Sequence, residues 1–121
     1  MKFMMMVKAD KDFEAGIPPS PALMAAIGQV TEEMMKSGVV LETGGLLPSS
    51  QGARLRLAGS KVTVIDGPFA EAKELIGGYA IIRANSKEEA IGLGSRFLKA
   101  HEEALGPSYV GEIEIRLMSE W

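Results

Sequence analysis

Two stretches of this chain carry the spacing of an amphipathic helix, and each stands between patterns typical of β-strands. The first begins after Ser20-Pro21, an N-cap followed by proline at the first helical position, and ends at Gly38. Its apolar residues recur at intervals of four, three and four: Leu23, Ile27, Val30 and Met34. The second begins at Ser86, which forms a capping box with Glu89, and ends at Gly106-Pro107. The sequence therefore predicts two helices set among strands.

Strand patterns fill most of the remaining length. In residues 2–9, Phe3, Met5 and Val7 share one face while Met4 and Met6 share the other, which is typical of a central strand covered on both sides. Residues 53–66 alternate around Gly59-Ser60 and predict a hairpin. Residues 10–19 have the pattern of a linker. Further strands are predicted at residues 39–43, 75–84 and 111–118. Within residues 75–84, paired glycines indicate a bulge or a close backbone approach.

The order of these elements specifies an architecture. The predicted order is strand, helix, strand, hairpin, strand, helix, strand. This is the split β-α-β order of the ferredoxin-like fold with an inserted β-hairpin. We predict one α+β domain over residues 1–121, with both helices on one face of an antiparallel sheet. The other face would be bare, with the methionines of the first strand and Ile76 or Ile82 exposing apolar side chains. Because such a patch marks an interaction surface, we expect a homodimer joined sheet to sheet.

Composition narrows the possible functions. The net charge of −3 and the pI near 5.2 offer no basic surface for nucleic acid. The chain has no cysteine and one histidine, so thiolate chemistry is excluded, and we expect neither a metal nor another cofactor. No segment approaches the roughly 20 apolar residues needed to cross a membrane. The apolar run at residues 3–7 is too short for a signal peptide, so we expect a cytoplasmic protein without membrane contact.

Asp66 is the strongest candidate for a catalytic residue. With Gly59-Ser60 as the turn, Asp66 falls on the same face as Val62 and Val64 and ends an apolar row. A carboxylate in an apolar setting is costly unless it is hydrogen-bonded or paired, and desolvation favours its protonated form. Asp66 is therefore a candidate general acid or base. Two alternatives remain open: a carboxylate that caps the Gly67-Pro68 turn, or an error in the register.

Polar residues after this turn, in the hairpin and beside the end of the second strand are candidate ligand contacts: Glu71, Lys73, Arg54, Glu42 and Ser49. Lys73 can serve as an anion contact beside Asp66, although Glu71, Lys73 and Glu74 also suit a solvated helical turn. Arg54 can grip an acidic ligand, although a solvated hairpin face explains it as well. Two rim candidates flank the glycine-rich break after the second strand, Glu42 and Ser49.

His101 lies four residues after Phe97, near the end of the second helix. The helix dipole stabilises positive charge there, which favours a structural role for the ring. A general-base role is the alternative, but Glu102 and Glu103 point elsewhere on the helix and leave the imidazole without an orienting acid. The role of His101 stays open.

The stretch VIDGPFAEAKELIGGY resembles the YCII-related family, in the branch named for its Asp-Gly-Pro-Phe (DGPF) motif. Residues 45–49 and 113–116 are similar to the same branch, and the likeness covers nearly the whole chain. The resemblance implies a dimeric α+β barrel of ferredoxin-like type. Some relatives are suspected enzymes because a His–Asp pair lines their cleft, with the histidine near the start of the first helix. This chain has no histidine there, so the resemblance leaves Asp66 without its imidazole partner.

Two hypotheses of function follow. The first is a cytoplasmic homodimer that binds a small molecule in a cleft between sheet and helices. Asp66 would be the polar anchor for this molecule, and Lys73 or Arg54 would be the counter-charge. The sequence leaves open whether the protein is an enzyme; if it is, Asp66 would be the general acid or base. The alternative is a non-catalytic interaction or regulatory module, a context suggested because members of this branch are often encoded beside extracytoplasmic-type sigma factors.

Overall fold

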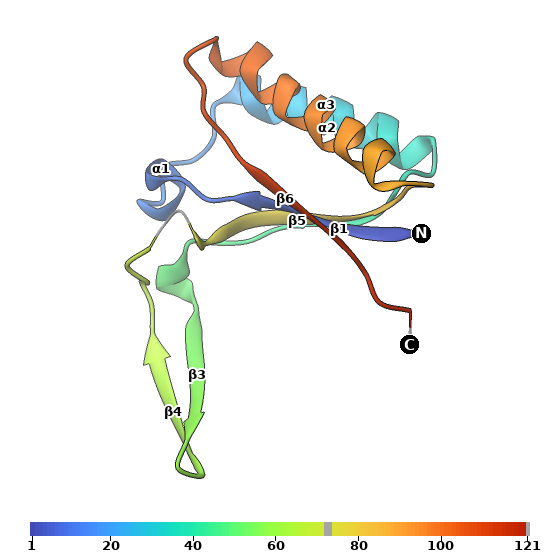
Figure 1. Cartoon of the computed structure of the whole chain (residues 1–121). Coiled ribbons are helices and arrows are strands. Elements are labelled where there is room, and N and C mark those ends of the chain that lie inside the picture. The colour runs from blue at the N-terminus through green and yellow to red at the C-terminus, as the bar shows by residue number, and fades with distance from the viewer. Residues whose placement is uncertain (72–73, 121) are drawn as a thin grey trace.

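The computed structural model describes residues 1–71 and 74–120. Its main sheet is antiparallel and four-stranded, in the order β2-β5-β1-β6, with bounds β1 Lys2–Lys8, β2 Val40–Gly45, β5 Ile76–Arg83 and β6 Ile113–Leu117. Two long helices cover one face of this sheet, α2 (Pro21–Lys36) and α3 (Lys87–Leu105) (Figure 1). The predicted ferredoxin-like α+β fold is confirmed, whereas the dimeric barrel stays a prediction.

The helix ends follow the predicted capping chemistry. Ser20 Oγ accepts a hydrogen bond from the backbone N–H of Leu23 at 3.2 Å, and Ser86 Oγ accepts one from Glu89 at 3.1 Å. Just past α2, Gly38 has φ 82°, and Gly106 at the end of α3 has φ 97°. Glycine adopts this backbone region without the strain that a Cβ would bring, so both helices stop where the sequence indicates.

The core lies between the sheet and the two helices. Phe3 and Met5 of β1 pair with Ile82 and Ala80 of β5, and all four side chains are buried beneath the helices together with Met34 of α2. The expectation that Ile82 lies on the bare face is wrong. Ile81 takes that face instead, because it pairs with Met4.

One detail of the connections differs from the prediction, and a second agrees with it. The predicted linker contains a short helix, α1 (Lys11–Glu14), whose N-cap Asp10 accepts a hydrogen bond from the Phe13 N–H at 2.7 Å. The predicted irregularity at the paired glycines is present, since Val7 pairs with Gly78 but Lys8 pairs with Ile76. Gly77 is therefore the extra residue, and a Cβ there would lie 3.5 Å from the Phe13 ring.

The hairpin forms a second, two-stranded sheet of β3 (Ala53–Ala58) and β4 (Lys61–Asp66), preceded by the short 3-10 helix η1 (Ser49–Gln51). We call residues 53–66 the arm. It extends away from the sheet on the side opposite the helices (Figure 1). Its turn residues Gly59 and Ser60 both have positive φ, and Leu55 pairs with Val64 as predicted. None of the helices described is long and apolar enough to span a membrane.

Candidate functional site

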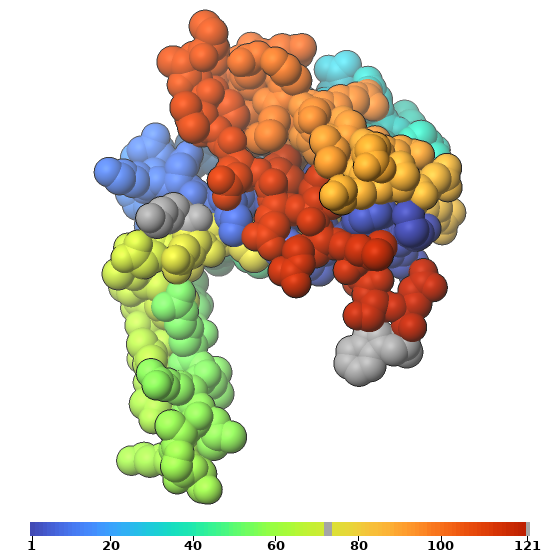
Figure 2. Space-filling model, viewed as in Figure 1, coloured from blue at the N-terminus to red at the C-terminus, as the bar shows by residue number. Residues whose placement is uncertain are grey.

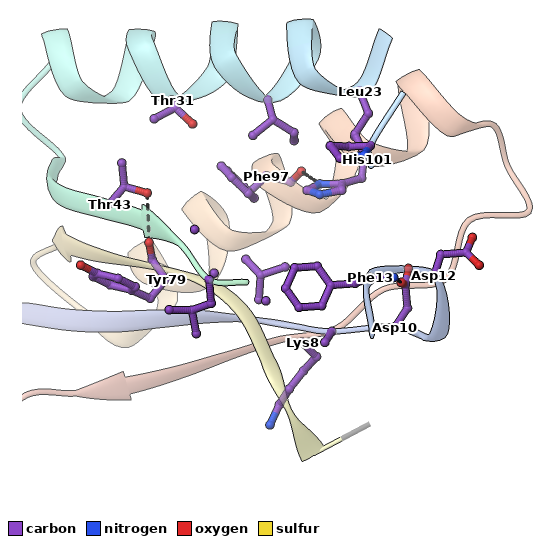
Figure 3. Close-up of a pocket in the computed structure, with 18 of the residues that line it drawn as sticks. Lys8, Asp10, Asp12, Phe13, Leu23, Thr31, Thr43, Tyr79, Phe97 and His101 are labelled. Carbon is purple, nitrogen blue, oxygen red and sulfur yellow. Dashed lines mark hydrogen bonds between the residues drawn. The ribbon is translucent and has the colours of Figure 1, made fainter. Parts of the chain in front are cut away.

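A cavity of about 590 Å³ lies between the helix-covered face of the sheet and the helices (Figure 3). Much of its wall is apolar, including Phe13 of α1, Leu23 and Ile27 of α2, and Phe97 of α3. Asp10, Asp12 and Ile17 also line it and are exposed to solvent, so the cavity opens beside α1.

The cavity exists because two strands lack side chains on their helix-facing side. Gly45 at the end of β2 pairs with Gly78 of β5, and Gly78 pairs in turn with Val7, which shares the helix-facing side of β1 with Phe3 and Met5. A Cβ at Gly45 would meet nothing within 4 Å. The apolar stripe of α2 therefore divides in two. Its C-terminal residue Met34 is fully buried in the core, whereas Leu23 and Ile27 face the open volume.

His101 lines this cavity from the last turns of α3. Its Nδ1 lies 2.9 Å from the backbone oxygen of Phe97, as Figure 3 shows. A carbonyl oxygen only accepts hydrogen bonds, so in the neutral ring Nδ1 carries the proton and Nε2 is left with a lone pair. The ring also packs between Phe97 and Tyr109, with centroids 5.5 and 5.4 Å away and the Tyr109 ring stacked at 17°. The imidazole is thus fixed in both orientation and tautomer.

Tyr109 forms the wall behind His101. A Cβ at Gly111 would lie 1.9 Å from the Tyr109 hydroxyl oxygen, so the phenol packs directly against a glycine backbone. Burial raises the pKa of Tyr109, and the negative charge of Asp10 raises it further. The phenol therefore stays protonated near neutral pH and is a hydrogen-bond donor.

The charged groups around the cavity differ in whether they are free to interact with a ligand. Lys8 is largely buried and its Nζ lies 3.2 Å from Glu114 Oε1, so its charge is already paired. Asp10 caps α1, and Asp12 is exposed at the mouth. Figure 3 shows the Lys8 amine on the side of the sheet away from the helices, so among the described lining residues Asp10 and Asp12 set the charge at the cavity mouth, and their field favours a neutral or cationic group over an anion.

Ser49 and the Asp-Gly-Pro-Phe turn meet in a different place, at the base of the arm. The Ser49 N–H donates to Glu14 Oε2 at 2.9 Å, and its hydroxyl donates to the other oxygen of the same carboxylate. The Phe69 N–H donates to Ser49 Oγ at 3.0 Å. Ser49 therefore connects α1 with the turn. Gly67 fits only as glycine, because a Cβ there would lie 1.7 Å from the Ser49 carbonyl oxygen.

Asp66 and Arg54 also lie at this base. Asp66 is paired opposite Ala53, which confirms the predicted register, and its side chain is exposed. The Arg54 guanidinium lies 4.0 Å from the centre of the Phe69 ring, in cation–π geometry. Among the described residues, no hydrogen bond to the Asp66 carboxylate is formed.

The remaining residues predicted from the sequence do not converge. Glu42 on β2 and Glu71 after the turn are exposed, and Lys73 lies outside the described residues. The cavity lining contains none of the five described candidates: Asp66, Arg54, Glu71, Glu42 and Ser49. It contains instead Asp10, His101 and Tyr109. Of these, only His101 is a candidate from the sequence alone, by its spacing from Phe97.

The comparison with known families gives a match over most of the chain. A family model of the YCII-related domain matches residues 1–97. The chain belongs to the YCII-related family. A stretch of 69 residues is 32% identical to an uncharacterized protein of Rhizobium meliloti (strain 1021). That stretch is 57% of this chain and 56% of the relative, so the match spans just over half of the relative's length.

The YCII-related match ends within α3, at Phe97. His101 and Tyr109, which form the polar wall of the cavity, lie beyond it. Asp10 and the glycines that leave the cavity open lie inside it. The cavity therefore combines a YCII-related body with a C-terminal segment outside the family match. Within residues 1–71 and 74–120, no cluster of three or more histidine or acidic side chains has the geometry to hold a metal ion.

Proposed function

We propose that the protein binds a small, largely apolar molecule in the cavity between sheet and helices, and that His101 exchanges a proton with it through Nε2. The observation that carries this proposal is the hydrogen bond from His101 Nδ1 to the Phe97 carbonyl oxygen. A general base must be held in one orientation with a free lone pair, and this bond supplies both conditions. The volume of about 590 Å³ lies within the range typical of small-molecule sites.

The charges indicate the class of ligand. Asp10 and Asp12 lie at the open end of the cavity, and the Lys8 charge is paired with Glu114. A carboxylic acid entering here would face two negative charges, and the described lining residues offer it no unpaired lysine or arginine. We therefore propose a ligand with an apolar body and a neutral or basic polar end. This differs from the acidic ligand that Arg54 and Lys73 suggest in the sequence.

If the protein is an enzyme, the same groups provide acid–base catalysis. His101 Nε2 would accept a proton from the bound molecule and return it at a second position. The Tyr109 phenol, kept protonated by burial, would donate a hydrogen bond to developing negative charge. A well-placed general base contributes about 10²- to 10⁴-fold in rate. Relatives that are suspected enzymes have their histidine near the start of the helix that corresponds to α2. His101 lines the same cavity as Leu23, which lies near the start of α2.

A ligand screen with two matched variants tests this proposal. Wild type is scanned by thermal unfolding against one set of neutral and basic fragments and one set of carboxylic acids. Gly45→Leu places a side chain in the cavity, and Gly28→Leu places the same side chain on the exposed face of α2; a Cβ at either site meets nothing within 4 Å. A ligand at ~100 times its Kd adds about 2.7 kcal/mol and raises the midpoint by a few degrees.

We expect hits mainly from the neutral and basic set. Their midpoint shifts should disappear in Gly45→Leu and persist in Gly28→Leu. In His101→Leu the shifts should shrink, because a hydrogen-bond partner is lost while the cavity stays open. Hits that bind Gly45→Leu as well as wild type would place the ligand outside the cavity and contradict the proposal.

A further inference from the structure

The short helix α1 forms one wall of the cavity, but little within the helix itself holds it in place. Its four residues make a single helical turn, and a helix this short is unstable in water without outside contacts. None of its side chains is fully buried. The Phe13 ring nevertheless lines the cavity, where it lies against Gly77 of β5 (Figure 3). A contact from elsewhere in the chain is therefore needed to keep this wall against the sheet.

Glu14 provides that contact through Ser49. Both oxygens of the Glu14 carboxylate accept hydrogen bonds from this one serine, one from its N–H at 2.9 Å and one from its hydroxyl. Among the described residues, these are the hydrogen bonds that join residues 11–19 to a distant part of the chain. Hydrogen bonds to an ionised carboxylate are stronger than those between neutral groups. Figure 2 shows α1 (blue) next to the base of the arm (yellow and green), where this contact lies.

The Asp-Gly-Pro-Phe turn, residues 66–69, holds Ser49 in the orientation that the carboxylate needs. The Phe69 N–H donates to Ser49 Oγ at 3.0 Å, so the hydroxyl hydrogen is left for the carboxylate. Gly67 packs so closely that its own Cβ, if present, would lie 1.7 Å from the Ser49 carbonyl oxygen. The Gly67 N–H also donates to the carbonyl oxygen of Gly52, at the end of η1. The turn and the helix η1 therefore form one closely packed unit.

We propose that the Asp-Gly-Pro-Phe turn is a clamp on the cavity wall: it orients Ser49, Ser49 holds Glu14, and Glu14 keeps the Phe13 ring at the cavity. Ser49 and Glu14 do not line the cavity, so they are positioning residues that act through Phe13. The apolar body of a ligand packs against this ring. When the clamp opens, fewer molecules have a complete wall, and the apparent affinity falls by the same factor. The inference rests on the proposed function, since it concerns the same cavity, but the position of the wall can be measured without a ligand.

The NMR signals of Gly77 report where the Phe13 ring lies, because an aromatic ring shifts the resonances of the nuclei packed against it. Phe13→Leu removes the ring and supplies the reference values. In Ser49→Ala the carboxylate loses its hydroxyl donor and the Phe69 N–H loses its acceptor. The Gly77 amide and Hα signals should therefore move at least about half of the way to the reference values. Ser50→Ala makes the same change at the exposed neighbouring residue and should leave them unchanged.

Variants of Glu14 separate a clamp from a general structural role. Glu14→Ala should shift the Gly77 signals in the same direction, and Glu14→Gln, which keeps an acceptor oxygen, should shift them less. The double variant with Ser49→Ala should shift them no further than the larger single change, since both substitutions remove one contact. The signals of Ala90, which is fully buried in the core, should stay unchanged throughout.

Three results in the absence of a ligand would overturn the proposal. The first is a Ser49→Ala protein whose Gly77 signals stay at their wild-type values. The second is a double variant in which the two single shifts add. The third is a movement of the Ala90 signals together with those of Gly77, because it would show a loosened fold and not a released wall.

Ligand affinity supplies the second readout. For a neutral or basic fragment of the screen that occupies the cavity, the Kd in Ser49→Ala should rise as the fraction of molecules with the ring in place falls. Gly77 signals that have moved halfway correspond to a Kd raised about twofold. A Kd that stays at its wild-type value while the Gly77 signals move overturns the role of the clamp in binding. If no fragment binds wild type, the proposed function fails, and the Gly77 signals still decide whether the turn holds the wall.

Discussion

Glu114 on β6 forms ion pairs with two basic side chains, and one of them, Lys8, also lines the cavity. Its two carboxylate oxygens lie 3.2 Å from Lys8 Nζ and 3.2 Å from Arg116 Nη1. The hydrogen bond from Lys8, and then that from Arg116, hold the pKa of Glu114 below its ordinary value. Glu114 thereby pairs with Lys8, the one lysine among the described lining residues of the cavity, and Asp10 and Asp12 are left to set the charge at its mouth.

This shift predicts a pH-dependent effect of Glu114→Gln. A carboxylate whose folded-state pKa is lowered stabilises the fold above its unfolded pKa of about 4.3, and this contribution is lost as the pH falls through the folded-state value. Wild type should therefore be the more stable protein at neutral pH, and the gap should close in the acidic range. Urea unfolding of both proteins from neutral pH down to about pH 2.5 measures it. A gap that is unchanged at the acid end would contradict the predicted linkage.

Among elements, α3 packs two glycines in contrasting environments. Gly92 is exposed, and a Cβ there would meet nothing within 4 Å. Gly94 is buried against the sheet, where a Cβ would lie 3.0 Å from Ile115 Cδ1 and 3.7 Å from Met5 Sδ. The close approach of α3 to β1 and β6 therefore depends on Gly94 and not on Gly92.

Alanine substitutions at these two positions should differ. Gly92→Ala should raise the free energy of unfolding by about 0.5–1 kcal/mol, because it lowers the backbone entropy of the unfolded chain and suits a helix. Gly94→Ala brings the same entropic gain, but Ile115 must move to admit the methyl group, so we expect no net stabilisation. Urea unfolding of the two variants beside wild type measures both effects. Equal stabilisation by both would show that α3 is packed less tightly on the sheet than the structure indicates.

The elements themselves could largely be predicted from the sequence, because their signals are local. Serine caps, terminal glycines and strict alternation specified both long helices and the register of the arm. The short α1 was missed, since Lys11–Glu14 is a single polar turn without a periodic apolar stripe. Ile82 was placed on the wrong face, and its true partner Phe3 could be identified only from the pairing of β1 with β5.

The site was harder to predict, because its parts come together only over long sequence distances. The hairpin register, which relates Asp66 to Arg54 and Ala53, could be predicted because the turn joins the two strands locally, whereas the contact of Ser49 with the Asp-Gly-Pro-Phe turn was not expected. The cavity instead requires Gly45 to lie opposite Gly78, and α3 to end above α1. A glycine adds no apolar side chain to the periodic pattern of a strand, so the sequence pattern does not reveal the open space that it leaves. The His101 ring gained its significance only when the Phe97 carbonyl and Tyr109 were placed around it.

At the scale of the whole molecule, the sheet separates two surfaces. The cavity lies on the helix-covered side, whereas the arm and the Met4–Ile81 stripe lie on the other. Variants of the arm should therefore leave the ligand shifts of the cavity unchanged.

The measurement that tests the central claim most directly is the ¹⁵N spectrum of the His101 ring. The chain contains one histidine, so its ring nitrogens give a single, unambiguous pair of signals. For the neutral ring we predict the tautomer protonated at Nδ1, with Nε2 unprotonated and its signal shifted by any fragment that occupies the cavity. A ring protonated at Nε2, or an Nε2 signal that does not respond to a cavity-binding fragment, would contradict the role assigned to His101.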